Sequence, residues 1–161
     1  MTLAERLDAL HETLRDAAVP HAFGGAIALA FWTLDPRGTR DLDVNVFVAA
    51  GEVLARLPEG IIVPADADEV IVREGQMRLW WDDTPVDLFF DYAPIHANAA
   101  RQAQRVPFAG AEIPVLGPVE LTVFKAMFDR TKDWAILAAR SASVETIRAG
   151  LRPMLDDENP R

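Results

Sequence analysis

Three aspartates stand where they could share metal ions. Asp41 and Asp43 lie two residues apart in one short segment, and Asp87 lies in a second segment, Pro85-Val86-Asp87-Leu88. Side chains two apart on a strand point to the same face, with Cα atoms about 7 Å apart. Carboxylates this close repel each other unless a cation lies between them, and Mg²⁺ prefers such oxygen ligands. Three carboxylates on neighbouring strands can hold two magnesium ions about 4 Å apart.

A pair of glycines, Gly24-Gly25, supplies a second feature. It follows the short apolar stretch His21-Ala22-Phe23 and precedes the apolar run from Ala26 to Leu34. A strand that ends in two glycines and opens into a helix lets the backbone approach a phosphate, which then faces the unpaired N–H groups and the helix dipole. Together with the metal ligands, this arrangement indicates phosphoryl or nucleotidyl transfer. Alone, the glycines would suit an ordinary tight turn equally well.

The segments that carry these residues have readable periodicities. Leu42 to Val48 alternates between apolar and polar faces and predicts a strand. Thr2 and Glu5 form a capping box ahead of leucines at helical spacing. Further helices are expected at 26–34, 51–57, 93–105, 119–129, 132–140 and 143–155, and further strands at 21–23, 69–73, 76–82, 86–91 and 111–116.

This order predicts an α+β fold. Helices and strands mix up to residue 116, whereas the part from Pro118 onward is helical with almost no strand signal. We therefore expect residues 1–116 to form a core and residues 117–161 to form a helical C-terminal segment packed on it, in one compact domain. In the second half, Asp82-Asp83-Thr84-Pro85 predicts a tight hairpin connection.

Composition excludes several classes of protein. The 161 residues contain no cysteine, which rules out disulfides, thiol catalysis and cysteine-ligated metals. The net charge of −9 argues against wrapping of duplex nucleic acid, which needs a basic surface. The longest nearly uncharged stretch is too short to span a bilayer, and the N-terminal residues do not form a signal peptide. We expect a cytoplasmic protein that does not bind membranes.

The motifs resemble the nucleotidyltransferase superfamily of the DNA polymerase β-like type. The resemblance rests on Gly24-Gly25-Ala26-x-Ala28-x-Ala30, on Arg37-x-Thr39-x-Asp41-x-Asp43, and on the later strand with Asp87. Lys125 and the run from Arg130 to Asp133 are similar to the C-terminal helices of a small bacterial branch, the abortive-infection toxin nucleotidyltransferases.

The resemblance implies a mixed β-sheet flanked by helices and a defined chemistry. A nucleoside triphosphate such as ATP would bind with two Mg²⁺ ions, or Mn²⁺, and a nucleoside monophosphate would pass to an acceptor hydroxyl with release of pyrophosphate. Asp41, Asp43 and Asp87 would be the catalytic and metal-binding residues. The residues expected to contact the nucleotide are Gly24, Gly25, Arg37, Thr39, Lys125 and Lys132.

Several alternatives stay open. Lys125 and Lys132 could belong to a solvated helix face with Asp129 between them, and Arg37 could be an ordinary loop charge. The acceptor could be tRNA, a protein or a small molecule, and a cognate inhibitor protein could exist. The chain could also be a catalytically inactive module that binds a nucleotide or a partner, or a two-metal nuclease.

Overall fold

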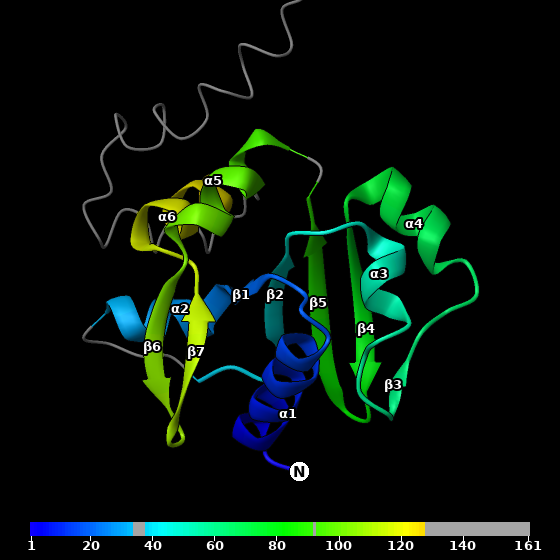
Figure 1. Cartoon of the computed structure of the whole chain (residues 1–161), viewed down its shortest axis with the longest axis horizontal. Coiled ribbons are helices and arrows are strands. Elements are labelled where there is room, and N and C mark those ends of the chain that lie inside the picture. The colour runs from blue at the N-terminus through cyan, green and yellow to red at the C-terminus, as the bar shows by residue number, and fades with distance from the viewer. Residues whose placement is uncertain (34–37, 92, 128–161) are drawn as a thin grey trace, which may run out of the picture.

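A mixed β-sheet forms the framework of the molecule (Figure 1). The computed structural model describes residues 1–33, 38–91 and 93–127, and among these it places seven strands in the order β3-β4-β5-β2-β1-β7-β6. Strands β2 and β5 pair in parallel, as do β1 and β7, and the other neighbours are antiparallel. The strands are β1 (His21–Phe23), β2 (Leu42–Val46), β3 (Ile61–Ile62), β4 (Gln76–Trp81), β5 (Thr84–Phe90), β6 (Gln104–Phe108) and β7 (Ala111–Val115).

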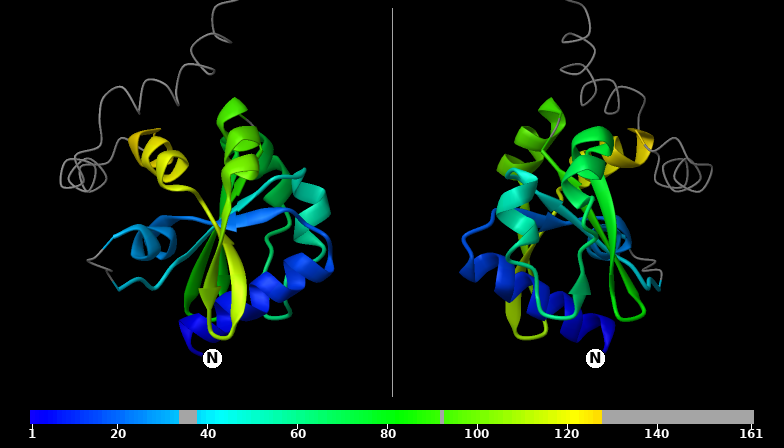
Figure 2. Two further views of the ribbon diagram at one scale, coloured as in Figure 1. Left: turned by 60° about the vertical axis from the view of Figure 1, so that its left-hand side comes forward. Right: turned by 90° about the vertical axis from the view of Figure 1, so that its right-hand side faces the viewer.

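Helices lie on both sides of this sheet. Figure 2 shows α1 and α3 on one side and α2 and α6 on the other. The helices are α1 (Leu3–Asp16), α2 (Gly25–Trp32), α3 (Ala50–Leu54), α4 (Ala67–Glu74), α5 (Pro94–Gln102) and α6 (Pro118–Met127). The expected α+β class, a mixed sheet flanked by helices, is confirmed.

Helix α1 begins at the predicted capping box, and its Arg6 side chain contacts the turn between β4 and β5. The Thr2 hydroxyl accepts a hydrogen bond from the Glu5 amide, and the Glu5 carboxylate accepts one from the Thr2 amide. Arg6 is buried and donates to the Thr84 hydroxyl at 2.8 Å and to the Asp82 carboxylate at 3.0 Å. The helix therefore holds the turn between β4 and β5 in place.

The central strands divide the sheet into an apolar face and a polar face. Leu42, Val44 and Val46 of β2 are fully buried, as the alternation predicted, and they pack in the same core as Leu88 of β5. Asp43 lies on the opposite face and is only partly buried. The period of two along the strand thus separates the core from the polar residues.

One expected strand is wrong. Residues 69–73 belong to α4, a helix that ends at Gly75 with a left-handed φ of 66°. The run Val70-Ile71-Val72 has the β-branched residues typical of strands, but its burial is helical: Ile71 is 5% exposed and Val72 is 87% exposed. The acidic residues Asp68 and Glu69 in the first turn complement the helix dipole and favour the helix further.

The helix expected at 93–105 is shorter than predicted. It ends at Gln102, and the chain then forms β6, which the sequence did not indicate. Strand β6 lies at the edge of the sheet, where Pro107 is tolerated because a missing N–H there breaks no central ladder. The turn to β7 consists of Ala109 and Gly110, both with positive φ.

The C-terminal part is described only as far as α6. This helix begins at Pro118, as expected, whereas the predicted helices at 132–140 and 143–155 lie outside the described residues. The division at residue 116/117 therefore stays a prediction. None of the helices among the described residues has the length and apolar character needed to cross a bilayer.

Candidate active site

Asp43, Asp87 and Arg78 form one row across three neighbouring strands. Asp43 of β2 is the direct partner of Asp87 in the parallel ladder, and Asp87 is the direct partner of Arg78 in the antiparallel ladder with β4. Adjacent strands lie about 4.8 Å apart. The structure therefore brings together two of the three predicted aspartates and adds a cation beside them.

Arg78 donates two parallel hydrogen bonds to the carboxylate of Asp87. Its Nε donates to Oδ1 at 2.7 Å and its Nη2 donates to Oδ2 at 2.6 Å. Nη2 also lies 3.5 Å from Oδ2 of Asp41. The hydrogen bonds from Asp87 raise the pKa of Arg78, and the nearby charges of Asp41 and Asp43 act in the same direction. The guanidinium is therefore a permanent positive charge among three carboxylates.

Asp41 is positioned by its own turn. Its backbone amide donates to the Thr39 hydroxyl at 3.2 Å, immediately before β2 begins. Such a hydroxyl contact two residues away is typical of a Ser/Thr turn. Thr39 thus orients the chain at the first aspartate, whereas its expected contact with a nucleotide stays a prediction.

The double glycine is packed directly against Asp43. The Gly24 amide donates to the Asp43 carbonyl oxygen at 2.8 Å, so the backbone continues the β1–β2 pairing up to the start of α2. Gly25 has a φ of 52°, and a Cβ atom built on it would overlap the Asp43 carboxylate. Only glycine fits there, because any side chain would displace an acid of the site.

Asn45 lies beneath the glycines on the same strand as Asp43. It is 3% exposed, and its Oδ1 atom has no hydrogen-bond partner among the described residues. A Cβ atom on Gly24 would come within 3.0 Å of the Asn45 Nδ2 atom. A buried amide with an unsatisfied oxygen is rare in the interior of a protein. The interior next to the glycine turn is therefore polar at Asn45.

A pocket of about 540 Å³ opens beside the carboxylates. It lies between α4 and the strands β4 and β5, and it is lined by Asp43, Val70, Glu74, Gln76, Met77, Arg78, Asp87, Leu88 and Phe89. Its volume falls in the range usual for small-molecule sites. Acidic and apolar side chains mix along its wall, and Arg78 is its one basic lining residue.

The other predicted contact residues are placed only in part. Lys125 is 8% exposed on α6, so the alternative of a solvated helix face is wrong for this lysine. Helix α6 packs against α2, the helix that begins at Gly25. Arg37 and Lys132 lie outside the described residues.

The tandem tryptophans point to opposite sides of β4. Trp81 is buried in the core, whereas Trp80 is 47% exposed on the face that carries Arg78. Its register partners are Ile62 of β3 and Pro85 of β5, and Ile62 is exposed as well. An apolar strip of Ile62, Trp80 and Pro85 therefore borders the charged row.

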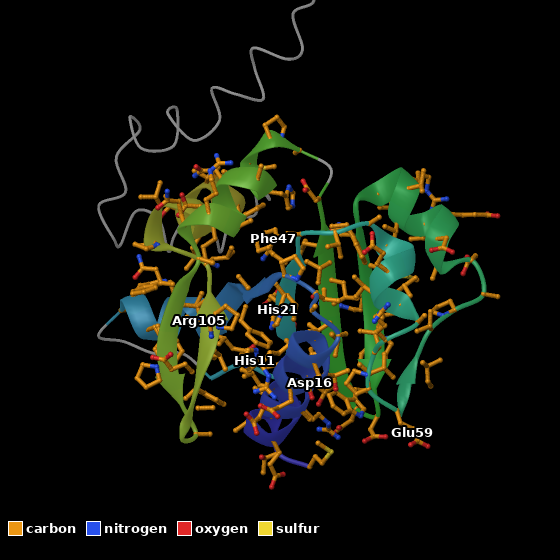
Figure 3. The ribbon with its side chains drawn as sticks, viewed as in Figure 1. His11, Asp16, His21, Phe47, Glu59 and Arg105 are labelled. Atoms are coloured by element: carbon orange, nitrogen blue, oxygen red, sulfur yellow. The ribbon has the colours of Figure 1, made fainter. Side chains whose placement is uncertain are left out.

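A buried histidine pair supports the strand that leads to the glycines. Figure 3 shows His11 of α1 close to His21 of β1. Nδ1 of His11 lies 2.9 Å from Nε2 of His21, and Nδ1 of His21 lies 2.7 Å from the Val19 carbonyl. Because a carbonyl only accepts, His21 donates from Nδ1, and a neutral His21 ring then accepts at Nε2 from the Nδ1–H group of His11. Burial lowers the pKa of His21 to about 4.

The donor set suits a hard divalent cation, with one rearrangement. Among the residues that the structure describes, no three histidine, aspartate or glutamate side chains are grouped as a ready-made metal site. The oxygens of Asp41, Asp43 and Asp87 are nevertheless the ligand type that Mg²⁺ prefers. Asp87 could serve as a ligand only if Arg78 left it, because both of its oxygens accept hydrogen bonds from the guanidinium.

Arg78 is the functional residue that the sequence interpretation missed. The signal was present in the hairpin. A two-residue turn at Asp82-Asp83 pairs Trp81 with Thr84, and counting back along both strands pairs Arg78 with Asp87. The predicted turn was correct, but its register was not used to find the partner of the third aspartate.

Comparison with known proteins identifies the architecture. No protein-family model matches the sequence, and no curated protein is significantly similar to it. The solution structure of the antibiotic-resistance factor ANT(2″)-Ia is 13% identical, with a TM-score of 0.59 over 96% of this chain and 92% of that chain. An antigenic nucleotidyltransferase-like protein from Paracoccidioides brasiliensis is 12% identical, with a TM-score of 0.46 over 92% of this chain and 76% of that chain. The chain has a nucleotidyltransferase-like fold.

Proposed function

We propose that this protein transfers a nucleoside monophosphate from a nucleoside triphosphate to an acceptor hydroxyl and releases pyrophosphate. The observation that carries the proposal is the packing of Gly25 onto Asp43, in a row with Asp87, on a nucleotidyltransferase-like fold. The start of α2 therefore lies directly beside a cluster of acids. Neither feature is needed by a structural sheet face.

The triphosphate would lie at the start of α2. The first-turn N–H groups of a helix have no intrahelical acceptor, and the helix dipole adds partial positive charge there. Helix α2 has no acidic residue in its first turn to compete for this charge. Gly24 and Gly25 carry no side chain, but the Asp43 carboxylate lies against Gly25, so phosphates would bind here together with the cations that neutralise this acid.

Asp41, Asp43 and Asp87 would hold two Mg²⁺ ions, or Mn²⁺. Bound there, the ions would supply charge neutralisation and a lower pKa of the attacking hydroxyl. In the transfer, the acceptor oxygen forms a bond to the α-phosphorus while the bond from that phosphorus to the α–β bridging oxygen breaks. The hydroxyl proton passes to the Asp87 carboxylate, and pyrophosphate leaves.

The pocket beside Asp87 favours a small-molecule acceptor. It is bounded by strands and by α4, and its volume of about 540 Å³ suits a ligand of small-molecule size. The overall charge of −9 is unfavourable for a polyanionic acceptor. An RNA acceptor and a cognate inhibitor protein would follow from the toxin-branch motif at residues 130–133, which lies outside the described residues.

One observation favours a second candidate, a binding module without turnover. Both oxygens of Asp87 accept hydrogen bonds from Arg78, so Asp87 has no oxygen free for a metal ion in this arrangement. A site without turnover could keep this ion pair permanently. The two candidates differ in one measurable respect, because only the enzyme releases pyrophosphate.

The test is a pyrophosphate-release assay with each of the four ribonucleoside triphosphates, Mg²⁺ and a cell extract as the source of acceptors. We expect Asp43→Asn to lower the rate by about a hundredfold or more, since it removes a ligand of both ions. Asp68→Asn is the matched control, because Asp68 is an exposed acid on α4 outside the pocket lining.

The fate of the label identifies the acceptor. With an α-³²P-labelled triphosphate, label in the small-molecule fraction of the extract supports the pocket argument, and label in RNA supports the toxin-branch alternative. Triphosphate binding without any pyrophosphate release would contradict the enzyme and favour the binding module. Cleavage of oligonucleotides without triphosphate would favour a nuclease.

A further inference from the structure

Arg78 holds the position that a metal ion would need. Both oxygens of Asp87 accept hydrogen bonds from its guanidinium, at 2.6 and 2.7 Å, and Asp41 lies 3.5 Å from the same Nη2 atom. The guanidinium thus bridges two of the three carboxylates proposed as metal ligands. A divalent cation shared by Asp41 and Asp87 would compete for the same oxygen atoms.

The exchange is sterically and electrostatically feasible. The Arg78 side chain is 50% exposed, whereas that of Asp87 is 17% exposed. The acid is therefore fixed in the sheet, and the arginine is the partner able to leave. The bidentate contact is stronger than a typical surface ion pair, so a competitor of higher charge, such as a divalent cation, is needed to displace the guanidinium. Arg78 also lines the pocket beside Asp87, so a released guanidinium stays at the site.

We propose that Arg78 is an internal counter-cation that competes with divalent metal for Asp87 and so sets the metal affinity of the site. In the metal-free protein it neutralises the repulsion between Asp41 and Asp87. When metal binds, Arg78 moves off Asp87 toward the pocket, where it can contact an anionic or hydroxyl-bearing ligand. This inference rests on the proposed function for the identity of the metal ligands, and Arg78 acts in it as a positioning residue.

The test measures metal binding, without any substrate, by calorimetric titration of Mn²⁺ into the purified protein. We expect Arg78→Gln to bind Mn²⁺ about tenfold more tightly than the wild type, because a positive charge a few ångströms from the ion is removed. Adding Asp87→Asn to this variant should abolish the gain. Arg15→Gln is the matched control, since Arg15 is 50% exposed like Arg78 and pairs with Glu12 and Asp16 of α1, outside the pocket lining.

A second measurement follows Arg78 itself. The ¹⁵N resonance of the Arg78 Nε–H group should shift during a Mg²⁺ titration of the wild type and should not shift in Asp87→Asn. Arg78→Lys provides a folded alternative should Arg78→Gln fail to fold, because it keeps the charge but loses the two-pronged contact. We expect Arg78→Lys to bind Mn²⁺ more tightly than the wild type, by less than Arg78→Gln.

Equal Mn²⁺ affinity in the wild type and in the arginine variants would overturn the inference, as would absence of Mn²⁺ binding in all of them. These results are separate from those for the proposed function. Tighter binding in Arg78→Gln without pyrophosphate release supports the competition and contradicts the enzyme. Pyrophosphate release with unchanged Mn²⁺ affinity supports the enzyme and contradicts the competition.

Discussion

Gly25 links the backbone conformation to the acid beside it. Its φ of 52° is costly for any other residue, and a Cβ atom there would overlap the carboxylate of Asp43. Two requirements therefore meet at one position. The turn needs a residue that tolerates positive φ, and the site needs a residue without a side chain.

Gly25→Ala should remove activity and cost about 1–3 kcal/mol of stability, because the alanine is strained and pushes Asp43 out of the row. The measurements are urea unfolding and pyrophosphate release. Gly51→Ala is the control: Gly51 lies in α3 with no atom within 4 Å of a built Cβ, so the change should be neutral or stabilising by up to about 1 kcal/mol. An alanine at position 25 that keeps wild-type stability and rate would contradict this account.

The charged row shows how neighbouring residues depend on one another. Asp43, Asp87 and Arg78 come from three strands and meet only because two ladders share β5. Asp87 is tolerated on a sheet face with 17% exposure because both of its oxygens accept hydrogen bonds from Arg78. Substitution of one member therefore alters the others.

Helix α4 is the element for which local composition and tertiary environment disagree. Its β-branched residues favour a strand, yet the segment is helical because Ile71 and Ala67 reach the core together while Val72 faces solvent. The helix also forms one wall of the pocket through Val70 and Glu74. Its stability therefore bears on the site.

The two faces of α4 should respond oppositely to alanine. Val72→Ala should stabilise the protein by about 0.5 kcal/mol, because alanine is the better helix former at a position with no packing to lose. Ile71→Ala should destabilise it by about 2–4 kcal/mol through loss of core packing. Urea unfolding of both variants checks the pair; destabilisation by Val72→Ala comparable to that by Ile71→Ala would be inconsistent with the helix.

At the scale of the whole molecule, the buried histidine pair connects stability to pH. The pKa of His21 is lowered from 6.5 to about 4, chiefly by burial, which outweighs the opposing hydrogen bond to the Val19 carbonyl, and further by the positive charge of Arg105 and of His11 when His11 is protonated. The pKa of His11 is lowered as well, chiefly by burial. The folded protein thus resists protonation at sites that the unfolded chain protonates readily.

Stability should therefore fall as the pH is lowered. Well above pH 6.5, His21 is neutral in both the folded and the unfolded state, and its full contribution to the free energy of unfolding is present. Between pH 6.5 and 4, the unfolded state binds a proton at His21 that the folded state does not bind, so this contribution is lost. The free energy of unfolding should drop by about 2 kcal/mol from pH 7 to pH 5 because of His21 alone. Urea unfolding at both pH values measures this, and the double variant His11→Phe/His21→Phe should show a much smaller drop. An equal drop in the double variant would assign the effect to other groups.

The sequence by itself offered candidates for the chemistry-bearing residues and determined the elements with strong local signals. Alternation predicted a strand from Leu42 to Val48, of which Leu42–Val46 is observed; the capping box predicted the start of α1, and the hairpin turn at Asp82-Asp83 was correctly expected. These features depend on residues close together in the chain. The metal ions, the acceptor and the roles of Arg37 and Lys132 remain predictions.

The tertiary structure alone decided which of these residues meet. It paired Asp43 with Asp87, brought Arg78 between Asp87 and Asp41, joined His11 to His21, and made a helix of residues 67–74. The physical reason is that strand register, burial and helix docking are set by contacts between distant segments. Local periodicity shows which face a residue occupies, but not which residue it faces.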